Sequence, residues 1–278
     1  MTLLTCFARV AELGSLSAAG RDLGVSQPTV TRQIDTLEAM LGTKLLHRSP
    51  HAVTLTPAGE VALADARKLL AEWDAFADRN GEAGEISGGL RVIVPVALGQ
   101  TVLAKAAAAF QSLHPLVTLD WRLSDADINL VAEGADCWIK VGPVRDDRLI
   151  VRSLAKIARR AVLAPAADAT RMIALGGFEA VSPVLKNSAG QTYSPEARVV
   201  FRTNNFMAAY QQVRAGAGFA VLPDWFVRSD LASGHLADLA PGFAAQPMPL
   251  SVAFLPGARP KRLDAFLYHM EEAAQHVT

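Results

Sequence analysis

The sequence predicts a chain of α/β class in which a mainly α N-terminal unit precedes an α/β domain. The first sixty residues carry apolar side chains at helical spacing, whereas from Leu90 onward β-branched runs alternate with helical stretches, as in a parallel α/β sheet. The 278 residues suffice for two domains, since a typical domain has about 150 residues. With 51% hydrophobic and 19% charged residues, the composition allows a sizeable core.

Two short helices separated by a glycine turn lie near the start of the chain. Ala18, Ala19 and Leu23 form the apolar face of the first helix, Gly24 ends it, and Ser26 starts the second. The inward stripe of the second helix comprises Val30, Ile34, Leu37 and Leu41. This arrangement is typical of a helix-turn-helix, whose second helix is suited to a DNA major groove.

The opposite face of the second helix is polar. Pro28, Arg32, Asp35 and Ala39 lie opposite the stripe, and three threonines flank them, namely Thr29, Thr31 and Thr36. Ser26 can cap this helix and Pro28 suits its first turn, where free amides also favour a phosphate.

The side chains at the start of this helix suit DNA. Gln27 can bind adenine in bidentate fashion, and Arg32 suits guanine or phosphate. Thr29 and Thr31 suit thymine or the DNA backbone. A helical hairpin with a solvated polar face would show the same spacing, so the spacing alone leaves both interpretations open.

A small β-wing follows the helix pair. Leu45 to Arg48 form one strand, a turn covers Ser49 to His51, and Val53 to Leu55 form the second strand. Thr56 and Pro57 then begin a long helix as its cap and first residue.

Through FARVAELGSLSAAGRDLGVSQPTVTRQIDTLEAMLGTKLLHRS, ending in LTPAGE, the chain resembles the winged helix-turn-helix of LysR-type transcriptional regulators nearly end to end. The resemblance implies that Arg48 anchors the wing on a phosphate and that Thr31 faces the DNA backbone. The residues that it places against bases are Gln27, Pro28, Thr29 and Arg32, with Ser26 as the cap of the same DNA-facing set.

The wing tip departs from the family pattern. Many members carry further Arg or Lys there, whereas this chain has Pro50, His51 and Ala52. We therefore expect weak contacts between the wing and DNA, or contacts that depend on the charge of His51.

The N-terminal unit has no net charge. Its basic side chains are Arg9, Arg21, Arg32, Lys44 and Arg48, and its acidic ones are Glu12, Asp22, Asp35, Glu38 and Glu60. Nonspecific affinity for DNA comes largely from neutralised phosphates, so a single unit should bind weakly. Pairing of two units in a dimer then becomes a requirement.

The helix after Pro57 offers a surface for that pairing. A narrow apolar seam consists of Ala62, Ala66, Leu69, Trp73 and Phe76. On periodicity alone, the seam could instead pack on its own domain. In the LysR family this linker helix pairs antiparallel between two chains, and the resemblance implies the same here. We assign residues 59–88 to the linker, with the segment from Asn80 to Gly89 as a flexible hinge.

Strands and helices alternate in the rest of the chain. We expect strands at 90–94, 117–123, 137–141, 219–222 and 251–255, and helices at 101–113, 128–133, 205–215 and 260–274. The chain should leave a first subdomain near Gly142 and return to it near Pro223.

This region resembles the LysR effector-binding domain, which is similar to periplasmic solute-binding proteins, in LRVIVP, FQSLHPLVTLDWRLSD, IKVGPVRDDRLIVRSL and RAGAGFAVLPDWFVRSDLASGHL. The resemblance implies a DNA-binding domain at 1–58 and an effector domain at 89–278. Within the latter, subdomain I comprises 89–142 and 224–278, and subdomain II comprises 143–223. The stretch from Pro165 to Phe201 is short for the family, so we expect a reduced or reshaped cleft.

Two segments are candidates for effector binding, because ligands of such sheets bind where helix N-termini follow the carboxyl ends of strands. They are Leu98, Gly99, Gln100 and Thr101, and Thr203, Asn204 and Asn205. Their amides and polar side chains suit a carboxylate or another small anion, to which Arg145, Arg202 or Lys140 could add charge. Plain helix capping accounts equally well for each segment on its own.

Enzyme motifs are missing from the sequence. The six histidines are scattered, and no HExxH, CxxC or GxSxG pattern occurs, so we predict no catalytic residue, metal site or cofactor. Cys6 and Cys137 fit buried free thiols, with redox sensing by Cys137 as a minor alternative. No run approaches the ~18 apolar residues of a membrane span and no basic leader opens the chain, so we expect a cytoplasmic protein without a membrane partner.

We therefore expect a sequence-specific DNA-binding transcriptional regulator whose activity a small, anionic effector modulates. The expected partners are a double-stranded DNA operator, the effector, further copies of the chain in a homodimer or homotetramer, and RNA polymerase. The alternatives are a regulator whose degenerate pocket senses no ligand and a small-molecule-binding protein of solute-receptor type.

Overall fold

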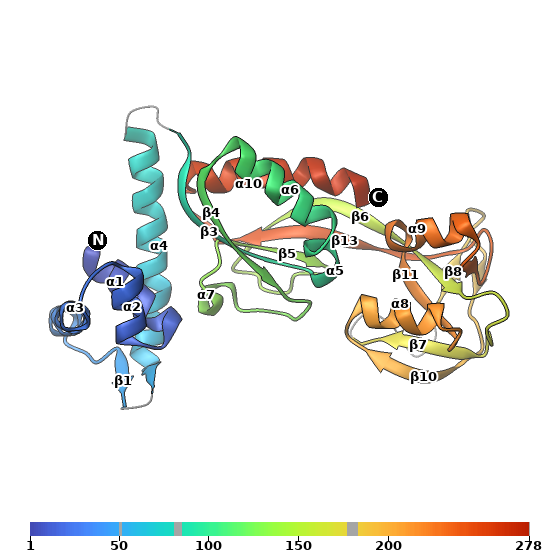
Figure 1. Cartoon of the computed structure of the whole chain (residues 1–278), viewed down its shortest axis with the longest axis horizontal. Helices are drawn as coiled ribbons and strands as arrows, with labels where there is room; N and C mark the ends of the chain where they lie inside the picture. The colour runs from blue at the N-terminus through green and yellow to red at the C-terminus, as the bar shows by residue number, and fades with distance from the viewer. Residues whose placement is uncertain (50–51, 81–84, 177–182, 278) are drawn as a thin grey trace.

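The structure, a computed structural model, describes residues 1–49, 52–80, 85–176 and 183–277. Figure 1 shows a helical head, a long helix α4 beside it, and an α/β domain whose two subdomains follow one another. The head and linker comprise α1 (Thr2–Leu13), α2 (Leu16–Asp22), α3 (Gln27–Leu41), β1 (Leu46–Arg48), β2 (Val53–Leu55) and α4 (Pro57–Asn80). No helix in these ranges is both long and apolar enough to cross a membrane.

Capping hydrogen bonds fix the helix starts in the head. Ser15 Oγ accepts from the amide of Ala18, and Ser26 Oγ accepts from the amide of Thr29, as the sequence predicts for α3. The predicted helix-turn-helix and wing are confirmed, and their apolar side chains share one core with α1 and the first half of α4. One position of the α3 stripe is wrong: Leu41 is exposed, and Glu38 is buried in its place.

The effector domain contains one sheet, in the order β10-β7-β11-β6-β13-β5-β3-β4, with short strands at its side. Its first elements are β3 (Ser87–Val94), α5 (Val96–Gly99), α6 (Val102–Leu113), β4 (Leu116–Leu123), α7 (Leu130–Glu133), β5 (Cys137–Val141), β6 (Ile150–Leu163) and β7 (Arg171–Leu175). The remaining ones are β8 (Leu185–Lys186), β9 (Thr192–Tyr193), β10 (Arg198–Thr203), α8 (Phe206–Arg214), β11 (Phe219–Pro223), α9 (Asp224–Ser233), β12 (Ala237–Asp238), β13 (Ala244–Phe254), α10 (Lys261–Ala274) and the 3-10 turn η1 (Gln275–Val277).

Two long antiparallel strands, β6 and β13, join the two subdomains. The first half of β6 pairs with β13 from Ile150 opposite Phe254 to Ile157 opposite Met248, whereas its last residues, 159–163, pair with β11 in the second subdomain. The register of β13 shifts at 245–248, where the chain passes from one subdomain to the other. The Arg159 guanidinium donates to the carbonyl oxygen of Gln246 at this point, at 2.8 and 2.9 Å.

This shared ribbon corrects the predicted subdomain boundaries. The chain crosses into the second subdomain along β6, well after Gly142, because the first half of β6 still belongs to the first sheet. It does not return near Pro223, because α9 packs over β11 and contributes Val227 to the core of the second subdomain. The return runs along β13, so residues 224–247 belong to the second subdomain.

The hinge expected from Asn80 to Gly89 does not extend over Ser87 to Gly89. Ser87 to Gly89 pair with Leu116 to Thr118 as the first rungs of the ladder between β3 and β4, so they are strand residues. Helix α4 continues to Asn80, and residues 81–84 lie outside the described part of the chain.

Ion pairs join the head and the linker helix to the effector domain. The Glu12 carboxylate on α1 lies 3.3 Å from Arg67 on α4 and 3.0 Å from Arg91 on β3. Farther along α4, Asp74 pairs with Arg262 at 2.5 Å, and Asp78 accepts the amide of Lys261 at 2.7 Å. That amide belongs to the first residue of α10, so a carboxylate of the linker helix caps a helix of the effector domain.

Both cysteines are buried and free, which confirms the prediction of buried thiols. Burial raises the pKa of the Cys6 thiol, and burial raises that of Cys137 well above its ordinary value. A thiolate at Cys137 is therefore strongly disfavoured at neutral pH, which argues against the alternative of redox sensing.

Candidate nucleic-acid interface and effector cleft

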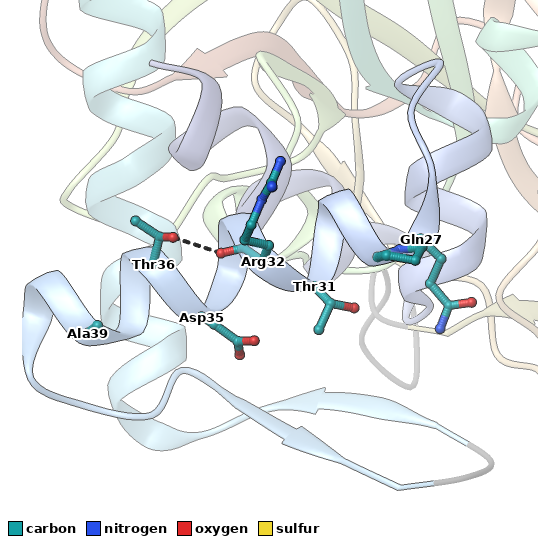
Figure 2. A pocket seen from close by; sticks show the side chains of 7 residues that line it. Gln27, Thr31, Arg32, Asp35, Thr36 and Ala39 are labelled. Carbon is teal, nitrogen blue, oxygen red and sulfur yellow. Dashed lines mark hydrogen bonds between the residues drawn. The ribbon is translucent and has the colours of Figure 1, made fainter.

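The outward side of α3 carries an open groove of about 690 Å³ (Figure 2). Its lining residues are Gln27, Pro28, Thr31, Arg32, Asp35, Thr36 and Ala39. The groove thus brings together four of the predicted DNA-facing residues: Gln27, Pro28, Thr31 and Arg32. Arg32 is exposed and forms no ion pair within the described part of the chain, so its guanidinium is available to a partner.

The cap residues at the start of α3 are largely occupied with each other. The Ser26 and Thr29 hydroxyls lie 2.9 Å apart, and Ser26 Oγ also accepts the amide of Thr29 at 3.3 Å. Ser17 on α2 donates to Gln27 Oε1 at 2.7 Å, which orients the side-chain amide of Gln27. The base contacts predicted for Gln27 and Thr29 remain predictions.

Glu38 joins the wing to α3. Its carboxylate is only 3% exposed and accepts the amides of Leu45 and Leu46 at 2.9 and 3.2 Å, as well as the Lys44 ammonium at 2.6 Å. Burial raises the pKa of Glu38, but these hydrogen bonds outweigh burial and hold it below its usual value. Glu38 lies one turn after Ile34 on the inward face of α3, and this position in the sequence could have indicated that its carboxylate is buried.

The Arg48 side chain lies along α3 in this structure. Its guanidinium is 2.8 Å from Asp35 and 3.5 Å from Glu38. The phosphate contact implied for Arg48 remains a prediction, and His51 lies outside the described residues. Asp35 was recognised on the polar face of α3 but was not among the predicted DNA-facing residues, although it lines the same groove as Arg32.

Few cations of the head are without a carboxylate partner. Arg9 pairs with Asp22 and Glu12, Lys44 with Glu38, and Arg48 with Asp35. Of the basic side chains at 1–49, this leaves Arg21 and Arg32 without an ion pair. The head is therefore not only neutral as a whole: most of its cations are also paired with a neighbouring carboxylate.

The predicted seam on α4 divides into two parts. Ala62 and Ala66 pack on the core of their own head, so their assignment to a surface between chains is corrected. Leu69, Trp73 and Phe76 are 50%, 50% and 49% exposed, and the two aromatic rings stack with centroids 5.7 Å apart. The head thus covers one end of the seam and leaves an aromatic surface at the other.

The first predicted effector segment directly precedes α6, whose N-cap is Thr101, but its first half belongs to a short helix, α5. Helix α5 begins at Val96, directly after Pro95. The amides of Gly99, Gln100 and Thr101 already bond to preceding carbonyl oxygens at 2.7 to 3.2 Å, so they are not free for an anion. The effector contacts predicted for 98–101 remain a prediction without the support of these three amides, and Leu98 lines a small apolar cavity between the subdomains.

The second segment does open a helix, with different roles for its three residues. Asn205 caps α8 by accepting the amide of Ala208 at 3.0 Å, and Thr203 Oγ1 accepts the amide of Asn205 at 3.1 Å. Asn204 instead lines an open cleft of about 300 Å³ between the subdomains, opposite Asp125, Lys140 and Arg145. Of the predicted effector residues, Asn204 alone lines this polar cleft.

The cleft has a polar mouth and a filled apolar floor. At the mouth Lys140 pairs with Asp127, burial raises the pKa of Asp125, and Arg145 is exposed without an ion pair in the described ranges. The adjoining apolar cavity measures only about 10 Å³, because Leu98, Ile157, Phe206, Trp225 and Phe226 approach one another across it.

A winged helix-turn-helix head, a linker helix with an exposed aromatic surface, and a two-part α/β domain with a central cleft define a DNA-binding regulator with an effector-binding domain. Comparison with known proteins agrees with this class. A family model described as LysR substrate binding domain matches residues 83–275, and one described as bacterial regulatory helix-turn-helix protein, lysR family, matches residues 1–60. The chain belongs to the LysR family of transcriptional regulators.

Similar proteins support this assignment. The HTH-type transcriptional regulator PtxR from Pseudomonas aeruginosa is 31% identical over 287 residues, which cover 97% of this chain and 91% of PtxR. The structure of a full-length OxyR variant from Pseudomonas aeruginosa matches with a TM-score of 0.71 at 18% identity, covering 99% and 94% of the two chains. Full-length LysG from Corynebacterium glutamicum, solved with bound effector Arg, matches with a TM-score of 0.65 at 19% identity, covering 99% and 97%. At these identities the two structures show the shared fold.

Proposed function

We propose that this LysR-type regulator reads its operator with the first half of α3, through Gln27, Pro28, Thr31 and Arg32, and responds to a small effector at the cleft mouth. The observation that carries the first part is the groove, which the exposed side chains of Gln27 and Arg32 both line. A guanidinium and a side-chain amide are the groups that read guanine and adenine in the major groove. RNA polymerase belongs to the proposal as a further partner.

Replacing Arg32 or Gln27 with alanine should relax sequence discrimination at one base pair each, by about 1 to 3 kcal/mol per lost contact. The fold should persist, because both side chains are exposed on α3. The measurement is selection of bound duplexes from a random pool, followed by affinity measurements on the selected operator. The exposed residue Glu60, outside the groove, supplies the control variant Glu60→Gln. Footprints that stay unchanged in both alanine variants would sink the assignment.

For the effector, the proposal names a small molecule with a carboxylate that contacts Arg145 and Asn204. Arg145 supports it as an exposed guanidinium without an ion pair in the described ranges, and Asn204 offers an amide across the same cleft. LysG, a regulator of the same fold, was solved with an amino acid as its effector. The filled floor of the cleft favours a second candidate function, a regulator that senses no ligand.

Thermal denaturation of the full chain across a library of carboxylic and amino acids should separate these two candidates. A true effector stabilises the folded chain by mass action and so raises the denaturation midpoint. At a hundred times its dissociation constant, this stabilisation is about 2.7 kcal/mol. Arg145→Gln should abolish the shift, whereas the exposed Arg148→Gln, whose partner is Asp146, should retain it. A library without any stabilising compound would favour the regulator with a degenerate pocket.

A further inference from the structure

A carboxylate lies where the DNA-facing groove should favour cations. Asp35 lines the groove together with Gln27 and Arg32, and its side chain is 53% exposed. DNA phosphates repel a carboxylate because both are negatively charged, whereas binding to DNA depends on cations that neutralise the backbone charge. The proposed contacts of α3 with bases do not account for this negative charge.

Asp35 has a specific partner. Its Oδ1 accepts from Arg48 Nη2 at 2.8 Å, and Arg48 is the arginine of the wing strand β1. The same Nη2 atom is 3.5 Å from Glu38, one turn farther along α3, so two carboxylates hold this guanidinium against the helix. Glu38 is itself fixed to the amides at the start of the wing, which makes the arrangement a built feature of the head.

We propose that Asp35 is a specificity-determining residue that withholds Arg48 from DNA phosphates and so suppresses nonspecific binding. Specificity is a difference of affinities, and a repulsive or sequestering group lowers the affinity for wrong partners. With Arg48 held, few unpaired cations remain in the head, so base contacts must supply a larger share of the binding free energy. This inference rests on the proposed function of α3.

The test compares full-length variants on a random-sequence duplex by fluorescence anisotropy at several salt concentrations. Asp35→Asn leaves Arg48 only its longer, 3.5 Å contact with Glu38, so the guanidinium should turn to a phosphate. The salt dependence should then steepen by about 0.9 units of log affinity per log salt for each phosphate that is newly neutralised. The affinity for the random duplex at low salt should rise by about three- to tenfold, as one or two additional phosphate contacts require. On a selected operator the increase should be smaller, so the ratio of specific to nonspecific affinity falls.

Two further variants identify the cause. Asp65→Asn makes the same change of net charge at an exposed position of α4, outside the groove, and should leave the random-duplex affinity nearly unchanged. Adding Arg48→Gln to Asp35→Asn should remove most of the increase, because the released guanidinium is then missing. Circular dichroism of each variant checks that the head remains folded.

The outcomes separate this inference from the proposed function. Unchanged random-duplex affinity in Asp35→Asn, or an equal increase in Asp65→Asn, would overturn the role of Asp35. A loss of operator binding with unchanged random-duplex affinity would also overturn it, because Asp35 would then be accepting a hydrogen bond from a base. If the wild-type chain selects no operator while Asp35→Asn still tightens random-duplex binding, the proposed function fails and the sequestering of Arg48 stands.

Discussion

Replacing Glu12 with glutamine is expected to destabilise the chain by up to about 3 to 5 kcal/mol, the cost of removing one partner from a fully buried ion pair, because Glu12 and its arginine partners are largely buried. Glu12 is 15% exposed and lies between Arg67 and Arg91, which are only 12% and 11% exposed. Two nitrogen atoms of Arg67, Nε and Nη1, are buried without a hydrogen-bond partner among the described residues, so the arginine depends on its pairing with Glu12 through Nη2. The variant would leave two guanidinium groups close together without their shared carboxylate.

Urea denaturation at neutral pH measures this effect. The matched control is Asp22→Asn, which removes the partner of the more exposed Arg9 within the head and should cost about 1 kcal/mol or less. Equal denaturation midpoints for Glu12→Gln and the wild type would contradict the expectation.

The acid dependence of stability provides a second measurement on the same residue. Burial raises the pKa of Glu12, but hydrogen bonds and charges from Arg91, Arg9 and Arg67 outweigh it and hold the pKa below its ordinary value of 4.5. The stabilisation is therefore complete above that ordinary value and is lost as the pH falls through the lower, folded-state pKa. The stability difference between the wild type and Glu12→Gln should shrink over this acid range and be constant near neutrality.

Replacing Leu69 and Trp73 together with aspartate should convert the proposed dimer into a monomer. Both side chains are half exposed on α4 next to Phe76, beyond the part of the helix that the head covers. Two carboxylates would have to be desolvated in any helix pairing through this surface, and that cost outweighs the benefit of burying the remaining apolar area. Light scattering of the full chain measures the mass. Val184→Asp with Tyr268→Asp, at two exposed apolar positions of the effector domain, is the control that should retain the dimer.

An undiminished dimer mass in the α4 variant would refute the pairing surface. A loss of dimer in the control variant as well would show that the assembly depends on the effector domain instead.

The head could be predicted closely from the sequence because its signals are local. Ser26, Pro28 and Gly42 mark the ends of α3, and alternation marks the wing strands, so boundaries follow from neighbours in the chain. The exchange of Leu41 for Glu38 on the buried face could not be foreseen with the same ease. It depends on the amides at the wing start, which a carboxylate satisfies and a leucine does not.

Predictions for the effector domain were weaker because its features depend on distant segments. The sequence predicts the return to the first subdomain near Pro223, but the pairing of β12 with β6 and the packing of Val227 keep the chain in the second subdomain. Likewise, the amides of Gly99, Gln100 and Thr101, which the sequence predicts to be free, donate to preceding carbonyl oxygens in the helical turn after Pro95. The pairing of Arg48 with Asp35 joins two elements whose distance along the sequence gives no sign of it.

The ribbon of β6 and β13 has a mechanical consequence for signalling. Since both strands run through both subdomains, rotation of one subdomain against the other must twist the ribbon, and its hydrogen-bond ladder resists that torsion elastically. The register of this ladder shifts at 245–248 and again at 250–251, and strands bend and twist more at such irregularities. The torsional stiffness of one pair of strands, rather than the length of a loop, thus sets how large a rotation the binding free energy of an effector can produce.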